Sequence, residues 1–233
     1  MFFNTNLKNI TLPQALETIE SGAFVYCLYL EEFFSNSPNF KVKNKILYNN
    51  NYTVLVGYPS NSFVNILDSV IEISSARGFS SSSFTRFTMQ QPITKIGPYI
   101  FRACINLEYV DISSFQVTRL YDATFYSCNK LKIIKLPPTI QVIEQYAFTF
   151  ISAKFIVLPF SLSSVNYYFL DGSYFNDIYY CGPNAVNNQI SSSKSVRIHV
   201  SSNYPSNTTQ FLKMEITDRS FSCTDDLYSS PKC

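Results

Sequence analysis

Few side chains in this sequence have the types and spacing that catalysis requires. The single histidine, His199, lies between Ile198 and Val200 in an alternating run. This position predicts an exposed residue of a strand rather than a positioned general base. Adjacent acids such as Asp225 and Asp226 are more typical of a solvated surface than of an acid–base pair, because neighbours on a strand point to opposite faces. The sequence therefore predicts a protein that is not an enzyme and has no catalytic residue.

Sites for metals, cofactors and nucleic acids are not indicated either. The six cysteines include no Cys-x-x-Cys pair, which argues against a zinc site. The two glycines closest in sequence, Gly172 and Gly182, are ten residues apart, so no glycine-rich phosphate loop forms locally. The net charge of +2 gives no strong attraction to nucleic acid or to an anionic membrane. We expect no cofactor, no metal and no nucleic-acid partner.

Three cysteines share one position of a repeated pattern. Cys27, Cys104 and Cys128 each follow a phenylalanine by three residues, and an isoleucine takes this place in the next unit. An apolar replacement predicts buried packing thiols, with a Cys104–Cys128 bridge between neighbouring units as an alternative. Towards the C-terminus, Cys223 and Cys233 could close a small loop in an oxidising compartment. The pattern alone does not choose among the pairings.

An internal repeat is the strongest feature of the sequence. Residues 7–24 and 131–148 are identical at nine of 18 positions without a gap. Pairs of aliphatic residues three apart also recur at intervals of 23, 24, 23 and 22 residues. These pairs begin at Val70, Ile93, Val117, Ile140 and Leu162. Such a period is typical of a solenoid, in which each coil buries its apolar side against the next.

Each unit combines a strand pattern with a segment of different spacing. Val110 and Ile112 alternate with other positions, as do Ile134 and Leu136, which is typical of a half-buried strand. The spacing Phe-x-x-Cys-x-x-Leu predicts a helical or 3₁₀ turn with one face inward. We therefore expect an α/β solenoid with a short strand and a helical turn in each coil of about 23 residues.

One insertion interrupts the period, and the repeat fades near the end. Residues 40–59 are predicted to form a β-hairpin, with asparagines 49–51 between two β-rich runs. After Cys181 the repeat is lost, and a last alternating strand could cover the open end of the stack. We divide the chain into a solenoid, residues 1–181, and an irregular C-terminal cap or tail, residues 182–233.

The motifs of the repeat resemble those of a known family. Leu-x-x-Ile-x-Leu-Pro is followed by Ile-Glu-x-x-Ala-Phe in residues 7–24 and 131–148, and Ile96-Gly97 is followed by Phe101, Cys104 and Leu107. Over roughly residues 7–181, the chain resembles the BspA-type leucine-rich repeats of bacterial and protist surface proteins. One unit departs from the pattern, because the segment 148–158 is one residue shorter than its predecessor.

The resemblance implies a leucine-rich-repeat solenoid that binds proteins of a host or a neighbouring cell. It implies a cell-surface or extracellular location and a role in adhesion or as a surface antigen, and no catalytic residue is carried over. The first six residues lack the basic flank and apolar stretch of a signal peptide, and no apolar run reaches the roughly 20 residues of a spanning helix. We therefore expect no membrane insertion and keep a cytoplasmic location as the alternative. The alternative function is a structural or self-assembling repeat protein without a distinct ligand, and the oligomeric state stays open.

The outward positions of the repeat strands predict where a protein partner binds. Aromatic and aliphatic side chains at these positions would form an exposed apolar patch, which often marks an interface. The alternative is that the C-terminal cap folds over this row. We define the candidate binding face as Tyr109, Asp111, Ile133, Lys135, Phe155 and Val157.

Overall fold

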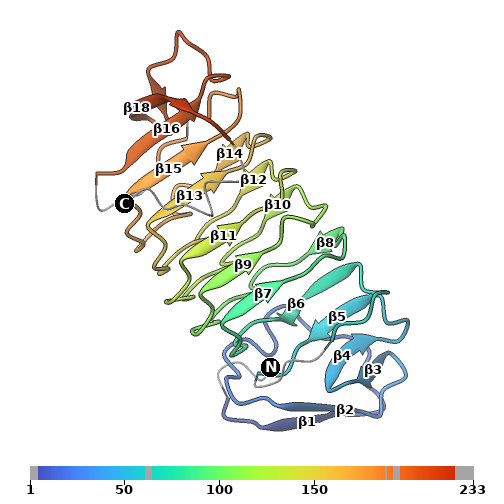
Figure 1. Ribbon diagram of the computed structural model, residues 1–233. Coiled ribbons are helices and arrows are strands. Elements are labelled where there is room, and N and C mark those ends of the chain that lie inside the picture. Colours follow the sequence, from blue (N-terminus) through green and yellow to red (C-terminus); the bar gives the residue numbers. More distant parts are fainter. Residues whose placement is uncertain (1–4, 61–64, 187, 191–194, 224–233) are drawn as a thin grey trace.

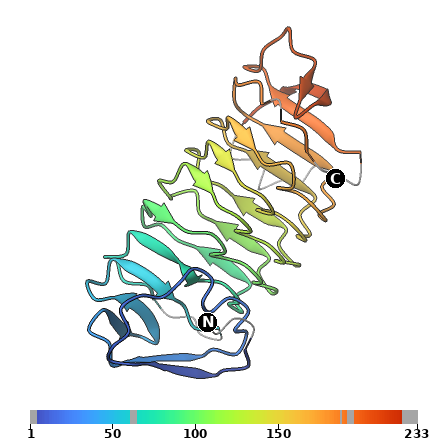
Figure 2. The ribbon, with the colours of Figure 1, turned by 180° about the vertical axis from the view of Figure 1, so that it is seen from behind.

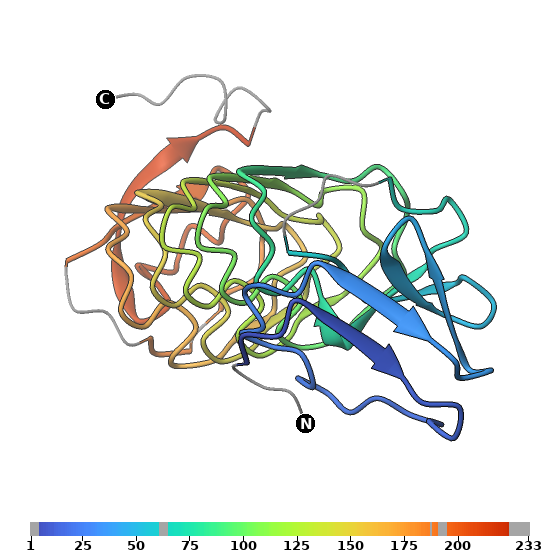
Figure 3. The ribbon, with the colours of Figure 1, turned by 90° about the horizontal axis from the view of Figure 1, so that it is seen from below.

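The computed structural model describes residues 5–60, 65–186, 188–190 and 195–223. These residues form an elongated β-solenoid of about nine turns that rises from β1 at one end to β18 at the other (Figure 1). Seen from below, successive coils overlap in outline (Figure 3). The solenoid predicted from the repeat is confirmed. Each regular coil has a strand on a first side, a shorter strand on a second side and a turn segment on a third.

The first side consists mainly of parallel strands. Its strands are β7 (Arg86–Thr88), β9 (Tyr109–Asp111), β11 (Ile133–Lys135), β13 (Phe155–Leu158), β15 (Asp177–Tyr180), β16 (Arg197–Ser201) and β18 (Met214–Phe221). Strands β1 (Asn9–Leu12) and β2 (Glu32–Ser35) form a separate parallel pair in the first coils. Strand β9 pairs with β7 and β11, and Val110 is in register with Phe87 and Ile134 on the inward face. Strands β13, β15, β16 and β18 continue as a second parallel group. Equivalent residues of successive coils are therefore in register, as the repeat requires.

The strand ladder is interrupted once along this side. Strands β11 and β13 lie side by side in Figures 1 and 2, but β11 pairs with β9 and β13 pairs with β15. The interruption falls at the unit in which residues 148–158 are one residue shorter than the equivalent segment before it. This departure of the sequence coincides with the boundary between the two groups. The coincidence is expected, because a change of one residue shifts strand register.

The second side has short strands that also stack in parallel. Its strands are β6 (Glu72–Gly78), β8 (Lys95–Ile96), β10 (Arg119–Leu120), β12 (Val142–Ile143) and β14 (Ser164–Val165). Leu120, Ile143 and Val165 are in register and buried. They belong to the aliphatic pairs that recur every 22 to 24 residues in the sequence. The period of the sequence is therefore the length of one coil.

The third side shows that the prediction of a helical or 3₁₀ turn is wrong. No helix occurs in the described ranges, and the segments after each second-side strand are consecutive turns. The amide of Phe101 donates to the carbonyl of Thr124 at 3.0 Å, and that of Ala103 donates to Tyr126 at 2.8 Å. A helix would direct these amides to carbonyls four residues earlier in the same segment. They instead join neighbouring coils, so the third side is also held by bonds between coils.

Left-handed backbone makes these turns possible. Two residues of a turn segment, four positions apart, have positive φ angles. The pairs are Gly22 and Tyr26, Tyr99 and Ala103, Ala123 and Ser127, and Tyr146 and Phe150. Each reversal turns alternate amides outward along the solenoid axis, where the next coil offers its carbonyls. Several of these residues are bulky, which makes this conformation unusual.

The interior is a ladder of phenylalanines from successive coils. Phe101 and Phe125 stack with ring centroids 5.2 Å apart, and Phe125 and Phe148 stack at 5.6 Å. All three rings are fully buried, as the shared repeat position predicts. The thiols of Cys104 and Cys128 are also buried and unbridged, which confirms packing thiols over a bridge between coils.

The first coils have a core of their own, and a buried arginine lies beside it. Phe24 and Cys27 belong to this separate cluster. The guanidinium of Arg77 in β6 donates to the carbonyls of Tyr58 at 2.7 Å and Phe24 at 2.9 Å, and to Ser60 Oγ at 2.6 Å. Burial lowers the pKa of Arg77 to about 10, so the side chain stays charged at neutral pH. Arg77 thus links the first coils to the segment that follows the insert.

The insert is a three-stranded antiparallel unit. Its strands are β3 (Phe40–Lys43), β4 (Ile46–Asn49) and β5 (Val54–Gly57). The predicted hairpin corresponds to β4 and β5, in which Tyr48 pairs with Leu55. Strand β3 was not predicted; it joins β4 through Asn44 and Lys45, both left-handed, as a two-residue hairpin turn requires. Strand β5 then pairs in parallel with β6 and so connects the insert to the solenoid.

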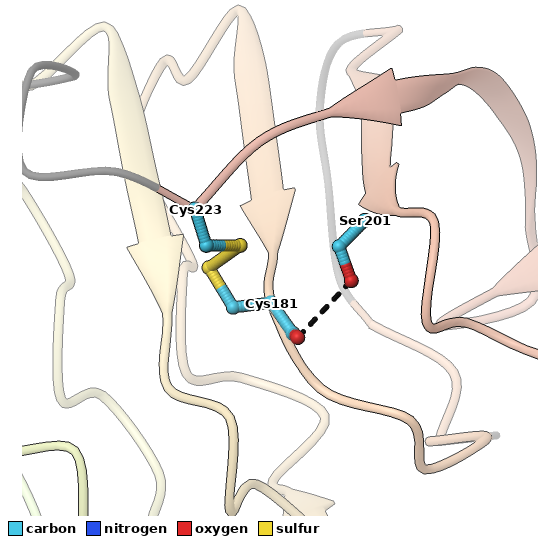
Figure 4. The surroundings of a disulfide bond; sticks show 3 residues. All are labelled: Cys181, Ser201 and Cys223. Carbon is cyan, nitrogen blue, oxygen red and sulfur yellow. Dashed lines mark hydrogen bonds between the residues drawn. A yellow bond between two sulfur atoms is a disulfide. The ribbon is translucent and has the colours of Figure 1, made fainter.

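A disulfide bond links the segment after β18 to the residue that follows β15. Cys223 pairs with Cys181, 42 residues earlier (Figure 4). The suggested pairing of Cys223 with Cys233 is therefore wrong, and Cys233 itself lies outside the described residues. The predicted terminal strand is β16, which pairs in parallel with β15, and β17 (Gln210–Phe211) pairs antiparallel with β18. The division at residue 181 stays a prediction.

Candidate protein-binding face

The structure places the candidate binding face on three neighbouring strands of the first side. Tyr109 is in register with Ile133, and Asp111 is in register with Lys135. Phe155 and Val157 occupy the outward positions of β13, beyond the interruption of the ladder. All six side chains are half-buried, because neighbours on the adjacent strands cover their flanks. The residues come together as a row, and their role in binding stays a prediction.

Contacts within the face fix its polar end. The guanidinium carbon of Arg86 lies 3.5 Å from the centre of the Tyr109 ring. The Tyr109 hydroxyl donates to Asp111 Oδ2 at 3.2 Å, and the Ser113 hydroxyl donates to Asp111 Oδ1 at 2.6 Å. Partial burial raises the pKa of Asp111, but the hydrogen bonds from Ser113 and Tyr109 outweigh it and leave the pKa below its ordinary value of 3.8. The carboxylate is therefore charged and held in place at neutral pH.

Aromatic side chains continue the face past the last predicted residue. Phe155 contacts Tyr179 edge to face at 6.1 Å, and Tyr179 stacks on His199 at 4.5 Å. Phe221 of β18 packs against the Tyr179 ring at 4.8 Å. Strands β16 and β18 lie edge to edge beyond β15, so these strands extend the face and do not cover it. The alternating pattern of residues 177–180 could have placed Tyr179 on the outward face. The repeat is too weak there, however, to align this segment with the preceding coils.

His199 is not the exposed strand residue that the sequence predicted. Its side chain is 15% exposed, and Nε2 lies 2.8 Å from Asp177 Oδ1 while Nδ1 lies 3.5 Å from Asp218 Oδ2. Arg197 donates two bonds of 2.7 Å to the Asp177 carboxylate. Both ring nitrogens therefore face carboxylates on neighbouring strands. This arrangement holds β15, β16 and β18 together and leaves no nitrogen directed at a substrate.

A hollow adjoins the polar end of the face. Its volume is about 630 Å³, and it lies between β7 and the segment that follows the insert. Arg86 and Thr88 of β7 line one wall, and Tyr58, Phe84 and Leu67 contribute apolar surface. A row of fixed side chains beside a hollow is a shape that can receive a side chain of a partner.

The described residues contain neither a metal site nor a membrane-spanning helix. No group of three or more histidine, cysteine, aspartate or glutamate side chains there has the arrangement of a metal site. Those residues also contain no helix with the length and apolar character needed to cross a membrane.

A repeat-family model and a solved structure agree with this architecture. Six copies of the BspA type leucine-rich repeat match residues 1–54 and 56–177. The chain is similar in structure to a leucine-rich cell surface protein from Faecalibacterium prausnitzii, with a TM-score of 0.62 and 26% identity, over 77% of this chain and 49% of that protein. It is also similar to a leucine-rich repeat protein from Bacteroides ovatus, with a TM-score of 0.47 and 17% identity, over 84% of this chain and 55% of that one.

The two solved structures match most of this chain but only about half of their own length. The chain spans about half the length of the Faecalibacterium protein, and no curated protein matches it. The repeat model covers most of the chain. The chain therefore belongs to the family of BspA-type leucine-rich-repeat proteins.

Proposed function

We propose that the chain is a non-catalytic protein-binding repeat module and that the candidate binding face contacts the partner. The observation that carries the proposal is the convergence of Tyr109, Ile133 and Phe155 on neighbouring strands, half-buried and flanked by charged side chains. Aromatic anchors that are already held in place lose little freedom on binding, which favours affinity. The partner is a protein of a host or neighbouring cell surface, and the role is adhesion.

Two observations support a cell-surface or extracellular location. The similar protein from Faecalibacterium prausnitzii is described as a cell surface protein. The Cys181–Cys223 disulfide is typical of an oxidising compartment, because cytosolic thiols are kept reduced. Three further thiols, those of Cys27, Cys104 and Cys128, are buried in the core. Their burial protects them from oxidation in such a compartment.

A double substitution tests the face. Ile133→Asp with Phe155→Asp places two charges at half-buried positions of the apolar end while leaving the phenylalanine ladder untouched. We expect the fluorescently labelled wild-type chain to bind intact cells, and protease treatment of those cells to remove the binding. The double variant is expected to lose binding, whereas Phe160→Asp, at an exposed side chain outside the face, retains it.

The same experiment separates the proposal from its alternatives. Thermal unfolding must show that the double variant is folded. Undiminished binding by a folded double variant rejects this face. Binding that survives protease treatment rejects a protein partner. Concentration-dependent oligomers in light scattering, together with no binding to cells, would favour the self-assembling repeat protein instead.

A further inference from the structure

The hollow beside the candidate binding face lies along an open edge of the first side. Strand β7 is the last strand of its sheet, and β9 and β11 continue the sheet on its other side. Strands β1 and β2 form a separate sheet, and the insert occupies the chain between β2 and β7. The described residues that line the hollow come mainly from β7, from residues 65–68 and from the segments around Tyr58 and Phe84, and none belongs to β9. The hollow therefore lies beside the edge of β7 that has no neighbouring strand among the described residues.

The main-chain groups of Arg86 and Thr88 point to this open edge. The amide of Met89 donates to the carbonyl of Asp111 in β9 at 3.4 Å, so Met89 and, two residues earlier, Phe87 face β9. Alternate residues of a strand direct their amide and carbonyl groups to opposite edges. Within the described part of the chain, no group forms a hydrogen bond with the main chain of Arg86 or Thr88. Two amides and two carbonyls are therefore open to the hollow.

The exposure of the side chains agrees with an open edge. Arg86 and Thr88 are exposed, whereas Tyr109 and Asp111, their in-register neighbours on β9, are half-buried between two strands. The equivalent side chains of β11 are half-buried as well. An edge with unpaired amide and carbonyl groups is a template for pairing with a further strand.

The floor of the hollow can receive an apolar side chain. Phe84 and Phe87 are buried with ring centres 5.4 Å apart, and Tyr58 contacts Phe84 edge to face at 6.1 Å. Leu67 lines the same hollow and is half-buried. A strand paired with β7 directs every second side chain to the side of Phe87, and therefore towards these apolar groups. The volume of about 630 Å³ is within the range of sites that enclose a ligand group.

The two ends of the hollow differ in charge. Arg86 begins β7, and its guanidinium carbon is held 3.5 Å from the centre of the Tyr109 ring. At the other end, beyond β7, Asp68 accepts a hydrogen bond of 3.4 Å from Gln91 Nε2. An extended ligand with an acidic group near Arg86 and a basic group near Asp68 is therefore favoured in one direction along β7.

We propose that an extended segment of the protein partner adds to β7 as a parallel strand. Such recognition combines main-chain hydrogen bonds with pockets for alternate side chains. The segment carries an acidic residue beside Arg86, an apolar residue beside Phe87 and a basic residue towards Asp68. A parallel strand continues the arrangement of β7, β9 and β11. The inference rests on the proposed function, and it names the form of the partner segment that the hollow receives.

The hydrogen bonds of a parallel pair define the register. The apolar residue beside Phe87 donates its amide to the carbonyl of Arg86, and its own carbonyl accepts from the amide of Thr88. These two bonds hold the apolar side chain over the hollow. Binding therefore depends on main-chain groups of the ligand as well as on its side chains.

A short peptide tests this dependence. The probe is the fluorescently labelled peptide Ser-Glu-Leu-Thr-Leu-Lys-Ser, titrated against the full chain by fluorescence anisotropy, and we expect the wild type to bind it. The same peptide N-methylated at its first leucine keeps every side chain but lacks the amide that pairs with Arg86. It should bind at least about tenfold more weakly. Exchange of the glutamate and the lysine should also weaken binding, because it reverses the charges at both ends.

A matched pair of variants tests the edge of the chain itself. The amide of Thr88 faces away from β9, so proline at this position removes no bond of the ladder, and sheet edges tolerate proline. Thr88→Pro should bind the peptide at least about tenfold more weakly. Thr88→Val retains the amide and should bind like the wild type. Thermal unfolding checks that both variants are folded, and the N-methylated peptide decides the question if Thr88→Pro is not.

Hydrogen exchange and the face variant complete the test. Without peptide, the amides of Arg86 and Thr88 should exchange fast in NMR spectra, and slow exchange would mean that another part of the chain already covers the edge. That result overturns the proposal, as does absence of peptide binding by the wild type or equal binding of the N-methylated peptide. The Ile133→Asp, Phe155→Asp variant should bind the peptide normally while losing cells. Cell binding by a wild type that ignores the peptide would therefore reject this inference and leave the proposed function standing.

Discussion

Arg77 shows how one residue can join segments that are distant in the sequence. Its three nitrogens reach carbonyl groups of the first coil and of the segment after the insert, together with Ser60 Oγ. The guanidinium is completely buried, and a buried charge is tolerated when its donors are matched by acceptors. The sequence offered no signal for this role, because nothing local distinguishes Arg77 from a surface arginine of a strand.

Replacing Arg77 should therefore damage the N-terminal coils. Arg77→Met keeps much of the side-chain volume but removes the hydrogen bonds that the guanidinium donates to the carbonyls of Tyr58 and Phe24. We expect a loss of about 3 kcal/mol in the free energy of unfolding, measured by urea denaturation. Arg119→Met, which removes a partly exposed ion pair with Glu144, should cost less than about 1 kcal/mol. Equal losses in the two variants would contradict this role of Arg77.

The charged cluster at the C-terminal end predicts a dependence on pH. Partial burial raises the pKa of Asp177, but hydrogen bonds from Arg197 and His199 outweigh it and leave the pKa below its ordinary value of 3.8. A carboxyl group with a lowered folded pKa stabilises the fold fully above its unfolded pKa. That contribution is lost as the pH falls from 3.8 through the lower folded value.

We therefore expect acid to weaken the attachment of β16 and β18 in particular. Thermal unfolding of the wild type and of Asp177→Asn should differ at neutral pH and converge as the pH falls below 3.8. Asp171→Asn, at a half-buried aspartate of a turn segment, serves as the matched substitution outside the cluster. A difference between wild type and Asp177→Asn that stays constant with pH would disprove the coupling.

The turn segment is the element in which sequence and structure differ most. Phenylalanine and cysteine three residues apart fit a helical turn, and they fit consecutive turns equally well, because both place residues three apart on the same side. The decisive feature is the left-handed backbone at positions such as Ala123 and Tyr146. Alanine, serine and tyrosine do not predict a left-handed backbone, whereas glycines recurring at these positions would have predicted it.

A pair of identical substitutions tests the left-handed turns. Ala103 and Ala147 are both buried, but Ala103 has a φ of 59° and Ala147 is not among the left-handed residues. Glycine removes one methyl group at either site and relieves strain at Ala103 alone. We expect Ala103→Gly to be more stable than Ala147→Gly by about 1 to 2 kcal/mol in chemical denaturation. Equal stability of the two variants would show that the turns are not strained as described.

At the scale of the whole molecule, most of the fold could be predicted from the period of the sequence. Recurring aliphatic pairs and phenylalanines predicted the coils and their buried ladder, since residues one period apart must meet in a stack. They also predicted which side chains face outward on β9, β11 and β13. The period already fades as the chain approaches Cys181, so the extension of the face through Tyr179 and the surroundings of His199 depended on strand pairing that no local pattern specifies.

The central claim is that neighbouring coils stack in register, because the core and the candidate binding face depend on it. An engineered cysteine pair measures this directly. Tyr109→Cys with Ile133→Cys places two thiols on partners in adjacent strands, whose Cα spacing of about 4.8 Å allows a disulfide. Tyr109→Cys with Phe155→Cys spans two coils, about 10 Å, which is too far. After mild oxidation, peptide mapping by mass spectrometry should find the bond in the first pair and not in the second. No bond in the first pair, or equal bonding in both, would contradict the stacked solenoid.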